Sequence, residues 1–369
     1  MSAPVRKATW LELFFDLVFV VAIAKAVHAL GHVHEGHIPT EYYVKYVLMI
    51  VPLWWAWTGH TLFANRFGTD DTLQRLMIFA QMACAISLAV FIDPDFDQHY
   101  RGFLFSYAAF RGLLVLMYWR AIVTVKKNAE VARYLANGFT VGLLISLSSL
   151  LFDGYWKYFV LYAGIGFDIL VPLIGRRRLK HAPVQSHHLP ERFGLLTIIL
   201  LGESVAGLVS SLDAVGVSGQ ALLAVFAGFV WTGSIWWAYF ENLEHCIYGR
   251  SLGTGQATIY LHLLIYIFLG GIANTIRFAI DPALALIDYK LLAGISTVGF
   301  VVALELLHLS YHPKAEWRPL LLNAAILFAL VIAGIALSPS SLITLLAMAA
   351  VFVAYASLDA RRRRKVNNA

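Results

Sequence analysis

The segment RFGLLTIILLGESVAGLVSSL, residues 192–212, decides the fold class of this chain. After Arg192 it carries a single ionisable side chain, Glu203, and as a helix rising about 1.5 Å per residue it would cross a hydrocarbon core of about 30 Å. Similar apolar runs recur along the whole chain. Together they predict an all-α fold, a polytopic transmembrane bundle of about 12 helices, near residues 10–30, 41–63, 72–92, 102–120, 133–152, 155–175, 192–212, 217–240, 257–280, 290–311, 318–337 and 340–358.

The composition of the 369-residue chain agrees with this prediction. Hydrophobic residues make up 60% of the sequence and charged residues only 14%, against about 25% charged residues in an ordinary soluble protein. This balance argues against a soluble enzyme. The two cysteines, Cys84 and Cys246, have neither the number nor the spacing of a disulfide framework or a cysteine metal site. The sequence also has no phosphate-binding loop, nucleophile elbow or zinc-protease helix, so we predict no cofactor.

The positive charges indicate how the chain is oriented. If all twelve helices cross the membrane, 21 of the 28 Lys and Arg residues fall on the side that holds both termini and 5 fall on the other side. Basic residues are retained on the cytoplasmic side of a membrane. We therefore expect a multi-pass protein of the inner (plasma) membrane with both termini in the cytoplasm. The net charge of +6 is then explained by topology and by contact with membrane lipids, not by nucleic acid.

Weak internal similarity suggests two related halves. Trp54-Trp55-Ala56-Trp57 aligns with Trp236-Trp237-Ala238-Tyr239, and residues 11–14 align with residues 190–193. The predicted organisation is a first six-helix half at 1–175, a basic cytoplasmic linker at 176–192, a second six-helix half at 193–360 and a basic cytoplasmic tail at 361–369. An even number of helices per half would give both copies the same orientation. The tryptophan clusters are expected to form an interfacial belt.

Few ionisable residues fall inside the predicted helices. Each costs at least about 2.5 kcal/mol in hydrocarbon, so such residues normally face a protein interior or a water-filled cavity. The group comprises Glu12, Asp16, Lys25, Arg111, Asp168, Glu203 and Glu305, with His60, His262 and His308 near the same side of the membrane as the termini. Because the acids outnumber the bases, some carboxylates should meet protons, water, histidine or a cation.

Three of these residues carry the main functional hypothesis. Asp16 and Glu203 are candidate cation-coordinating or proton-binding groups, and Arg111 is the candidate counter-charge. The alternatives are structural: Glu203 and Arg111 form an ion pair, Asp16 packs inside the protein, and Glu12 stabilises a helix N-terminus through the helix dipole.

A histidine cluster follows the first predicted helix. His28, His32, His34 and His37 lie close together in the sequence, and His28 and His32 are four residues apart, as two ligands of one transition metal can be. These four residues are candidate metal ligands, although a polar or pH-titrating loop is the favoured interpretation.

Two motifs resemble a known family. The stretch LELFFDLVFV at residues 11–20, and HLPERFGL at 188–195 continuing to LGES at 201–204, are similar to the bacterial low temperature requirement A (LtrA) family, over nearly the whole chain. The resemblance implies a polytopic bacterial inner-membrane protein and marks Glu12, Asp16, Glu191, Arg192 and Glu203 as motif positions. It implies no specific molecular activity.

These observations favour a transporter or channel for a small cation or a proton-coupled solute. The alternatives are a membrane-embedded enzyme, a lipid- or temperature-responsive sensor, and an assembly protein whose buried acids only pack. Assembly into a homo-oligomer would be compatible with each of them.

Overall fold

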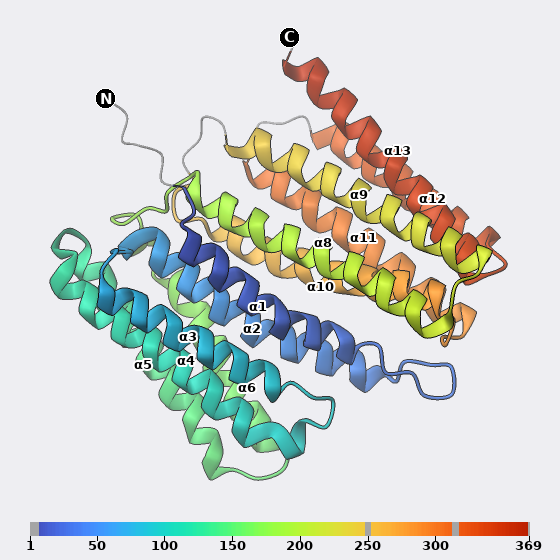
Figure 1. Ribbon diagram of the computed structural model, residues 1–369. Coiled ribbons are helices and arrows are strands. Elements are labelled where there is room, and N and C mark those ends of the chain that lie inside the picture. Colours follow the sequence, from blue (N-terminus) through green and yellow to red (C-terminus); the bar gives the residue numbers. More distant parts are fainter. Residues whose placement is uncertain (1–6, 248–251, 312–316, 368–369) are drawn as a thin grey trace. The chain divides into compact units, whose positions relative to one another are not determined.

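The computed structural model describes residues 7–247, 252–311 and 317–367, and these residues confirm the all-α prediction (Figure 1). The helices are α1 Trp10–Ala29, α2 Thr40–Phe67, α3 Thr72–Val90, α4 Phe96–Thr124, α5 Ala129–Ser148, α6 Tyr155–Ile174, α7 Arg176–Leu179, α8 His188–Val215, α9 Gly219–Ile247, α10 Gln256–Ile280, α11 Leu286–Tyr311, α12 Trp317–Leu337 and α13 Ser341–Asn367. Every predicted apolar run is one of the long helices, and α7 is a single turn in the predicted linker.

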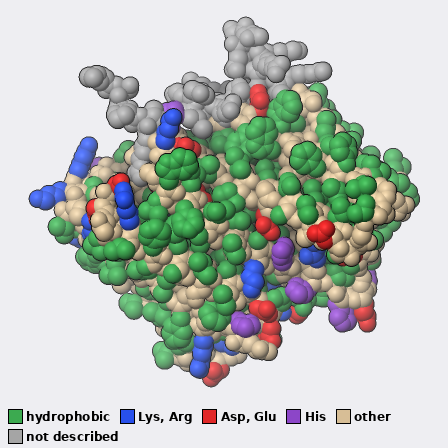
Figure 2. Space-filling view, in the orientation of Figure 1, with side chains coloured by type: hydrophobic (Ala, Val, Ile, Leu, Met, Phe, Trp, Pro, Cys, Tyr) green, Lys and Arg blue, Asp and Glu red, His purple; other side chains and the backbone are tan. Residues whose placement is uncertain are grey.

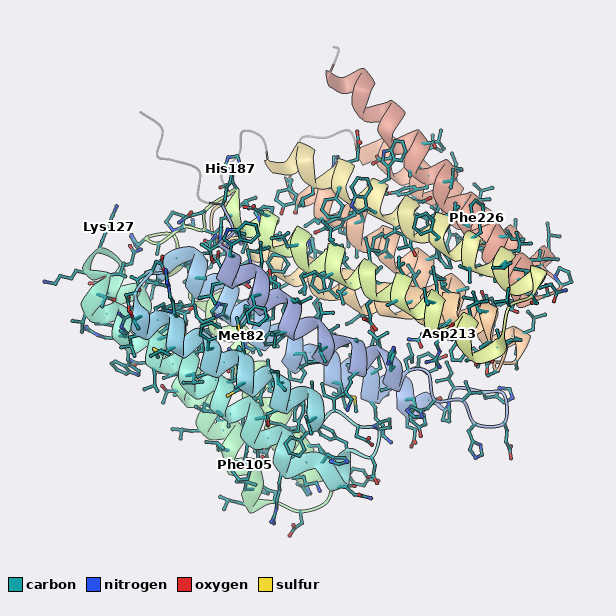
Figure 3. All side chains as sticks on the ribbon, viewed as in Figure 1. Met82, Phe105, Lys127, His187, Asp213 and Phe226 are labelled. Carbon is teal, nitrogen blue, oxygen red and sulfur yellow. The ribbon has the colours of Figure 1, made fainter. Side chains whose placement is uncertain are left out.

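Ten helices in the described part of the chain are long and apolar enough to cross a bilayer. They are α2 to α6, α8 to α11 and α13, while α1 is set apart by Glu12, Asp16 and Lys25. Hydrophobic side chains cover much of the face drawn in Figure 2. Phe105, labelled in Figure 3, is 55% exposed, whereas Met82 of α3 is buried. Apolar surface on this scale is what lipid contact requires, and the chain is a polytopic membrane protein.

The chain divides into two compact units. The first unit contains residues 1–26, 48–192 and 251–256, and the second contains residues 27–47, 193–250 and 257–369. In the first unit α3 packs against α4, α4 against α5, and α5 against α6. In the second unit α9 packs against α11 and α13, and α11 packs against α12.

Glycines set the close approach of α5 and α6 in the first unit. A Cβ added to Gly138 would lie 2.6 Å from a methyl group of Val171, and one added to Gly142 would overlap Oδ1 of Asp168. Small residues spaced four apart let membrane helices pack backbone to backbone. At Gly142 the missing side chain leaves the space in which the Asp168 carboxylate lies.

The tryptophans of α2 correct one sequence-based interpretation. Trp54, Trp55 and Trp57 are all buried, with at most 1% of their surface exposed, so they are core residues and not an interfacial belt. Trp236 and Trp237 of α9 are each 50% exposed. The indole N–H of a buried tryptophan usually needs a hydrogen-bond partner. The N–H of Trp57 donates to the carboxylate of Asp16.

Candidate functional site

The first unit contains a buried group of charges that we call the Arg192 cluster: Glu12, Asp16, Trp57, His188 and Arg192. The Arg192 guanidinium donates two hydrogen bonds to Asp16, from Nε to Oδ2 at 3.1 Å and from Nη2 to Oδ1 at 2.6 Å. Trp57 Nε1 donates a third to Asp16 Oδ1 at 2.7 Å. Asp16 and Arg192 are both fully buried. The geometry is the bidentate fork that arginine forms with carboxylates.

Glu12 joins this cluster to the start of α1. Thr9 N donates to Glu12 Oε2 at 2.8 Å and Glu12 N donates to Thr9 Oγ1 at 3.3 Å, which is a capping box. The predicted helix-end role of Glu12 is therefore present. The same carboxylate also lies 3.2 Å from His188 Nε2 and 3.3 Å from Arg192 Nη1. Glu191, the neighbouring motif residue, accepts a hydrogen bond from the Ala8 backbone at 3.2 Å.

Arg192 lies in a different place from the one that the sequence predicts. The apolar run predicts a helix that begins at residue 192, which leaves Arg192 at the end of the basic linker. Helix α8 begins instead at His188, so Arg192 lies one turn inside the helix. Pro190, in the first turn, was the available signal, since proline favours the first turn of a helix. With Arg192 in the interior, the expected excess of unpaired acid does not apply to Asp16.

A second group, the Arg111 cluster, consists of Trp55, Gly59, Tyr107, Arg111 and Asp168. Arg111 Nη2 donates to Asp168 Oδ2 at 2.7 Å, and both side chains are buried. The ring of Trp55 lies 5.8 Å from the guanidinium carbon. A Cβ on Gly59 would lie 2.7 Å from Arg111 Nη1, so only glycine leaves room there. The ion pair of Arg111 is thus made with Asp168, whereas the structural alternative drawn from the sequence pairs Arg111 with Glu203.

Polar atoms without partners concentrate around the Arg111 cluster. Within the described residues, Arg111 Nε and Nη1, Asp168 Oδ1 and the Tyr107 hydroxyl are buried and make no hydrogen bond. Trp55 Nε1 is also buried and makes no hydrogen bond. A buried polar group left unsatisfied costs about 1–3 kcal/mol, so several on neighbouring helices mark a place where a further polar species would be stabilised.

Helix α2 separates the two clusters. Trp57 contacts Asp16, and Gly59 contacts Arg111. Residues two apart on a helix point about 200° apart, so the clusters lie against roughly opposite faces of α2. His60 is fully buried beside them: its Nδ1 lies 2.7 Å from Gln81 Oε1, and its ring stacks on Phe15 at 3.9 Å.

The remaining candidates lie in the second unit and do not form one group. Glu203 is 3.7 Å from His28 Nε2, with 29% of its side chain exposed. His262 Nδ1 donates to the Thr258 carbonyl at 2.6 Å, so its Nε2 accepts the Tyr239 hydroxyl at 2.7 Å.

Glu305 and His308 complete the set of predicted residues. The Glu305 carboxylate accepts a hydrogen bond from the Tyr355 hydroxyl at 2.8 Å. His308 is buried in α11, one turn from Glu305.

The outer histidines are spread over different contacts. His37 Nδ1 lies 2.6 Å from Asp288 Oδ2, His34 and His37 pair through their backbones, and the His32 ring stacks on Tyr42. Across the described ranges, no three His, Cys, Asp or Glu side chains are grouped as metal ligands. The observed contacts are those of a polar loop.

Comparisons with known proteins show one relative and one family that this chain resembles. The chain is 28% identical over 251 residues to an uncharacterized protein of Rhizobium meliloti (strain 1021), which is 64% of this chain and 59% of that protein. The chain thus spans about three-fifths of the length of this relative. Residues 7–357, which include both charge clusters, match the family described as bacterial low temperature requirement A protein. The chain therefore belongs to the bacterial low temperature requirement A (LtrA) family.

Proposed function

We propose that this protein is a transporter or channel for a small cation or a proton-coupled solute, and that the Asp168–Arg111 pair is its ion-responsive element. The observation that carries the proposal is the unpaired Oδ1 of Asp168 beside the unpaired Nε and Nη1 of Arg111, all buried within the described residues. Arg111 lies near the middle of α4, a candidate span. Ionisable residues held at such a depth are characteristic of ion and proton pathways.

The chemistry of the pair suits a single-proton step. Arg111 remains protonated at any working pH, so the pair is neutral when Asp168 is ionised. A proton on Asp168 Oδ1 gives the pair a net positive charge, and the unpaired oxygen is the one free to receive it. Entry of a small cation beside Asp168 would have the same electrostatic effect. The pair thus has two charge states that differ by one unit, which is what coupling to an ion gradient requires.

Asp16 and Glu203 have different parts in this proposal. Asp16 already accepts three hydrogen bonds, from Arg192 and Trp57, so we assign the Arg192 cluster to positioning helices and not to ion coordination. Glu203 is partly exposed beside His28, and we retain it as a second proton-binding candidate. We therefore assign the ion-responsive role to Asp168.

Purified full-length protein in liposomes, loaded in parallel with a pH-sensitive dye and with a K⁺- or Na⁺-sensitive dye, tests this function. We expect K⁺ or Na⁺ gradients to produce proton or cation flux above that of empty liposomes, and Asp168→Asn to abolish most of it. Asp153→Asn is the matched control, because Asp153 is exposed in the loop before α6. Wild-type vesicles no more permeable than empty ones, or an Asp168→Asn variant as active as wild type, would refute the proposal.

We also propose insertion in the inner membrane with both termini in the cytoplasm. The support is the distribution of Lys and Arg between the two sides, which is 20 to 5 once Arg192, buried inside α8, is left out of the 21. Fusions of a reporter that is active only in the cytoplasm should report activity at both termini. An inactive fusion at either end, in correctly inserted protein, would contradict this orientation.

A further inference from the structure

A surface cavity of about 780 Å³ lies among α5, α6 and α7, entirely within the first unit. One end is lined by Arg133, Arg178 and His181 together with one acidic residue, Glu130, so the two arginines give this end a net positive charge. The other end is apolar and includes Val141 and Phe167, which are both exposed. A cavity with a cationic end and a hydrocarbon end matches an amphiphile with an anionic head.

The cationic end is held in place by packing. Tyr134 donates a hydrogen bond from its hydroxyl to the Val171 carbonyl at 2.8 Å, which fixes the ring between α5 and α6. The Arg178 guanidinium lies over that ring, 4.8 Å from its centre. Within the described part of the chain, neither Arg133 nor Arg178 has a carboxylate within 4.0 Å. Both guanidinium groups are therefore free to bind an anion.

The length and position of the cavity match one lipid leaflet. Its lining on α5 runs from Glu130 to Val141, about 16 Å along the helix, which is about half of a 30 Å hydrocarbon core. Helix α6 ends at Ile174, and the basic residues of α7 follow directly. The cationic end thus lies where the span ends and headgroups begin, and the apolar end extends toward the middle of the bilayer.

We propose that this cavity is a binding site for one anionic phospholipid. The lipid phosphate would bind Arg133 and Arg178, and one acyl chain would lie along Val141 and Phe167. Arginine is suited to this role because its planar guanidinium binds phosphate oxygens in a bidentate manner. The apolar wall selects a lipid over a free phosphate, and the positive charge selects an anionic over a zwitterionic headgroup. This site is independent of the proposed ion-responsive pair.

Lipid titration of the delipidated full-length protein in detergent tests the site, with native mass spectrometry counting bound lipids. The probes are phosphatidylglycerol, phosphatidylcholine and glycerol 3-phosphate. We expect one tightly bound phosphatidylglycerol, with weaker phosphatidylcholine binding and no displacement by glycerol 3-phosphate. Arg133→Gln and Arg178→Gln should each weaken binding about fivefold. The matched control is Arg176→Gln/Arg177→Gln, which removes two exposed charges from α7 that do not line the cavity.

A second variant tests the apolar end separately. Val141→Trp places a large ring in the cavity and leaves both arginines unchanged, so it should reduce phosphatidylglycerol binding without altering the fold. The proposal is overturned if the two lipids bind equally or if glycerol 3-phosphate competes as well as the lipid. It is also overturned if the control on α7 weakens binding as much as the loss of Arg133 and Arg178.

Discussion

Replacing Arg192 by methionine should be among the most damaging single changes to the first unit. The substitution removes both guanidinium hydrogen bonds to Asp16, leaving that carboxylate with only the Trp57 N–H, and it removes the charge 3.3 Å from Glu12. Breaking a buried ion pair by removing one partner costs about 3–5 kcal/mol. We expect the upper end of that range, because two acids lose the same cation. Asp16→Leu should cost less, since Arg192 then still has Glu12.

The double variant Asp16→Leu/Arg192→Met distinguishes pairing from simple loss of packing. It replaces the ion pair by apolar side chains, an exchange that is often nearly neutral, so it should be more stable than Arg192→Met alone. Reversible unfolding of the full chain in detergent, with Arg177→Met on the exposed surface as control, measures the differences. The reasoning is refuted if Arg192→Met costs less than about 1 kcal/mol, or if the double variant is no more stable than Arg192→Met alone.

Two further predictions follow from local geometry. Gly142→Ala should displace the Asp168 carboxylate and destabilise the α5–α6 packing by about 1–3 kcal/mol, whereas Gly166→Ala, which meets no atom within 4 Å, should not; thermal unfolding compares them. In the loop between α2 and α3, the side-chain hydrogen bond from Arg120 lowers the pKa of Asp71 from 3.8 to about 2. The stability from this pair should be complete above about pH 4 and lost as the pH falls through 2, and Asp71→Asn should lack that dependence in an acid titration.

The helices could be predicted from the sequence because a membrane leaves few options. Each span must form its backbone hydrogen bonds within itself and must be apolar over a fixed length. Composition alone therefore places the helix. The error at α8 was only four residues at its start. This difference of about one helical turn moves Arg192 from a helix end to the interior. The net charge of the buried site around Asp16 therefore depends on where α8 begins.

The pairing of charges could not be predicted in the same way. Arg111 and Asp168 are 57 residues apart, and which face of each helix turns inward depends on side-chain packing with a third helix, α5. The sequence therefore marks both residues as buried and ionisable, but it offers Asp16 and Glu203 as the acids that Arg111 balances and offers no partner for Asp168. The pairing is set by packing between helices, which no single segment of the sequence records.

The space that Gly142 provides for Asp168 has an evolutionary consequence. A side chain at position 142 and a carboxylate at position 168 exclude each other, because the added carbon would occupy the place of Oδ1. In aligned homologues, residues larger than glycine at 142 should occur together with small, uncharged residues at 168. Positions 142 and 168 should thus covary, and an alignment of sequences is enough to detect this.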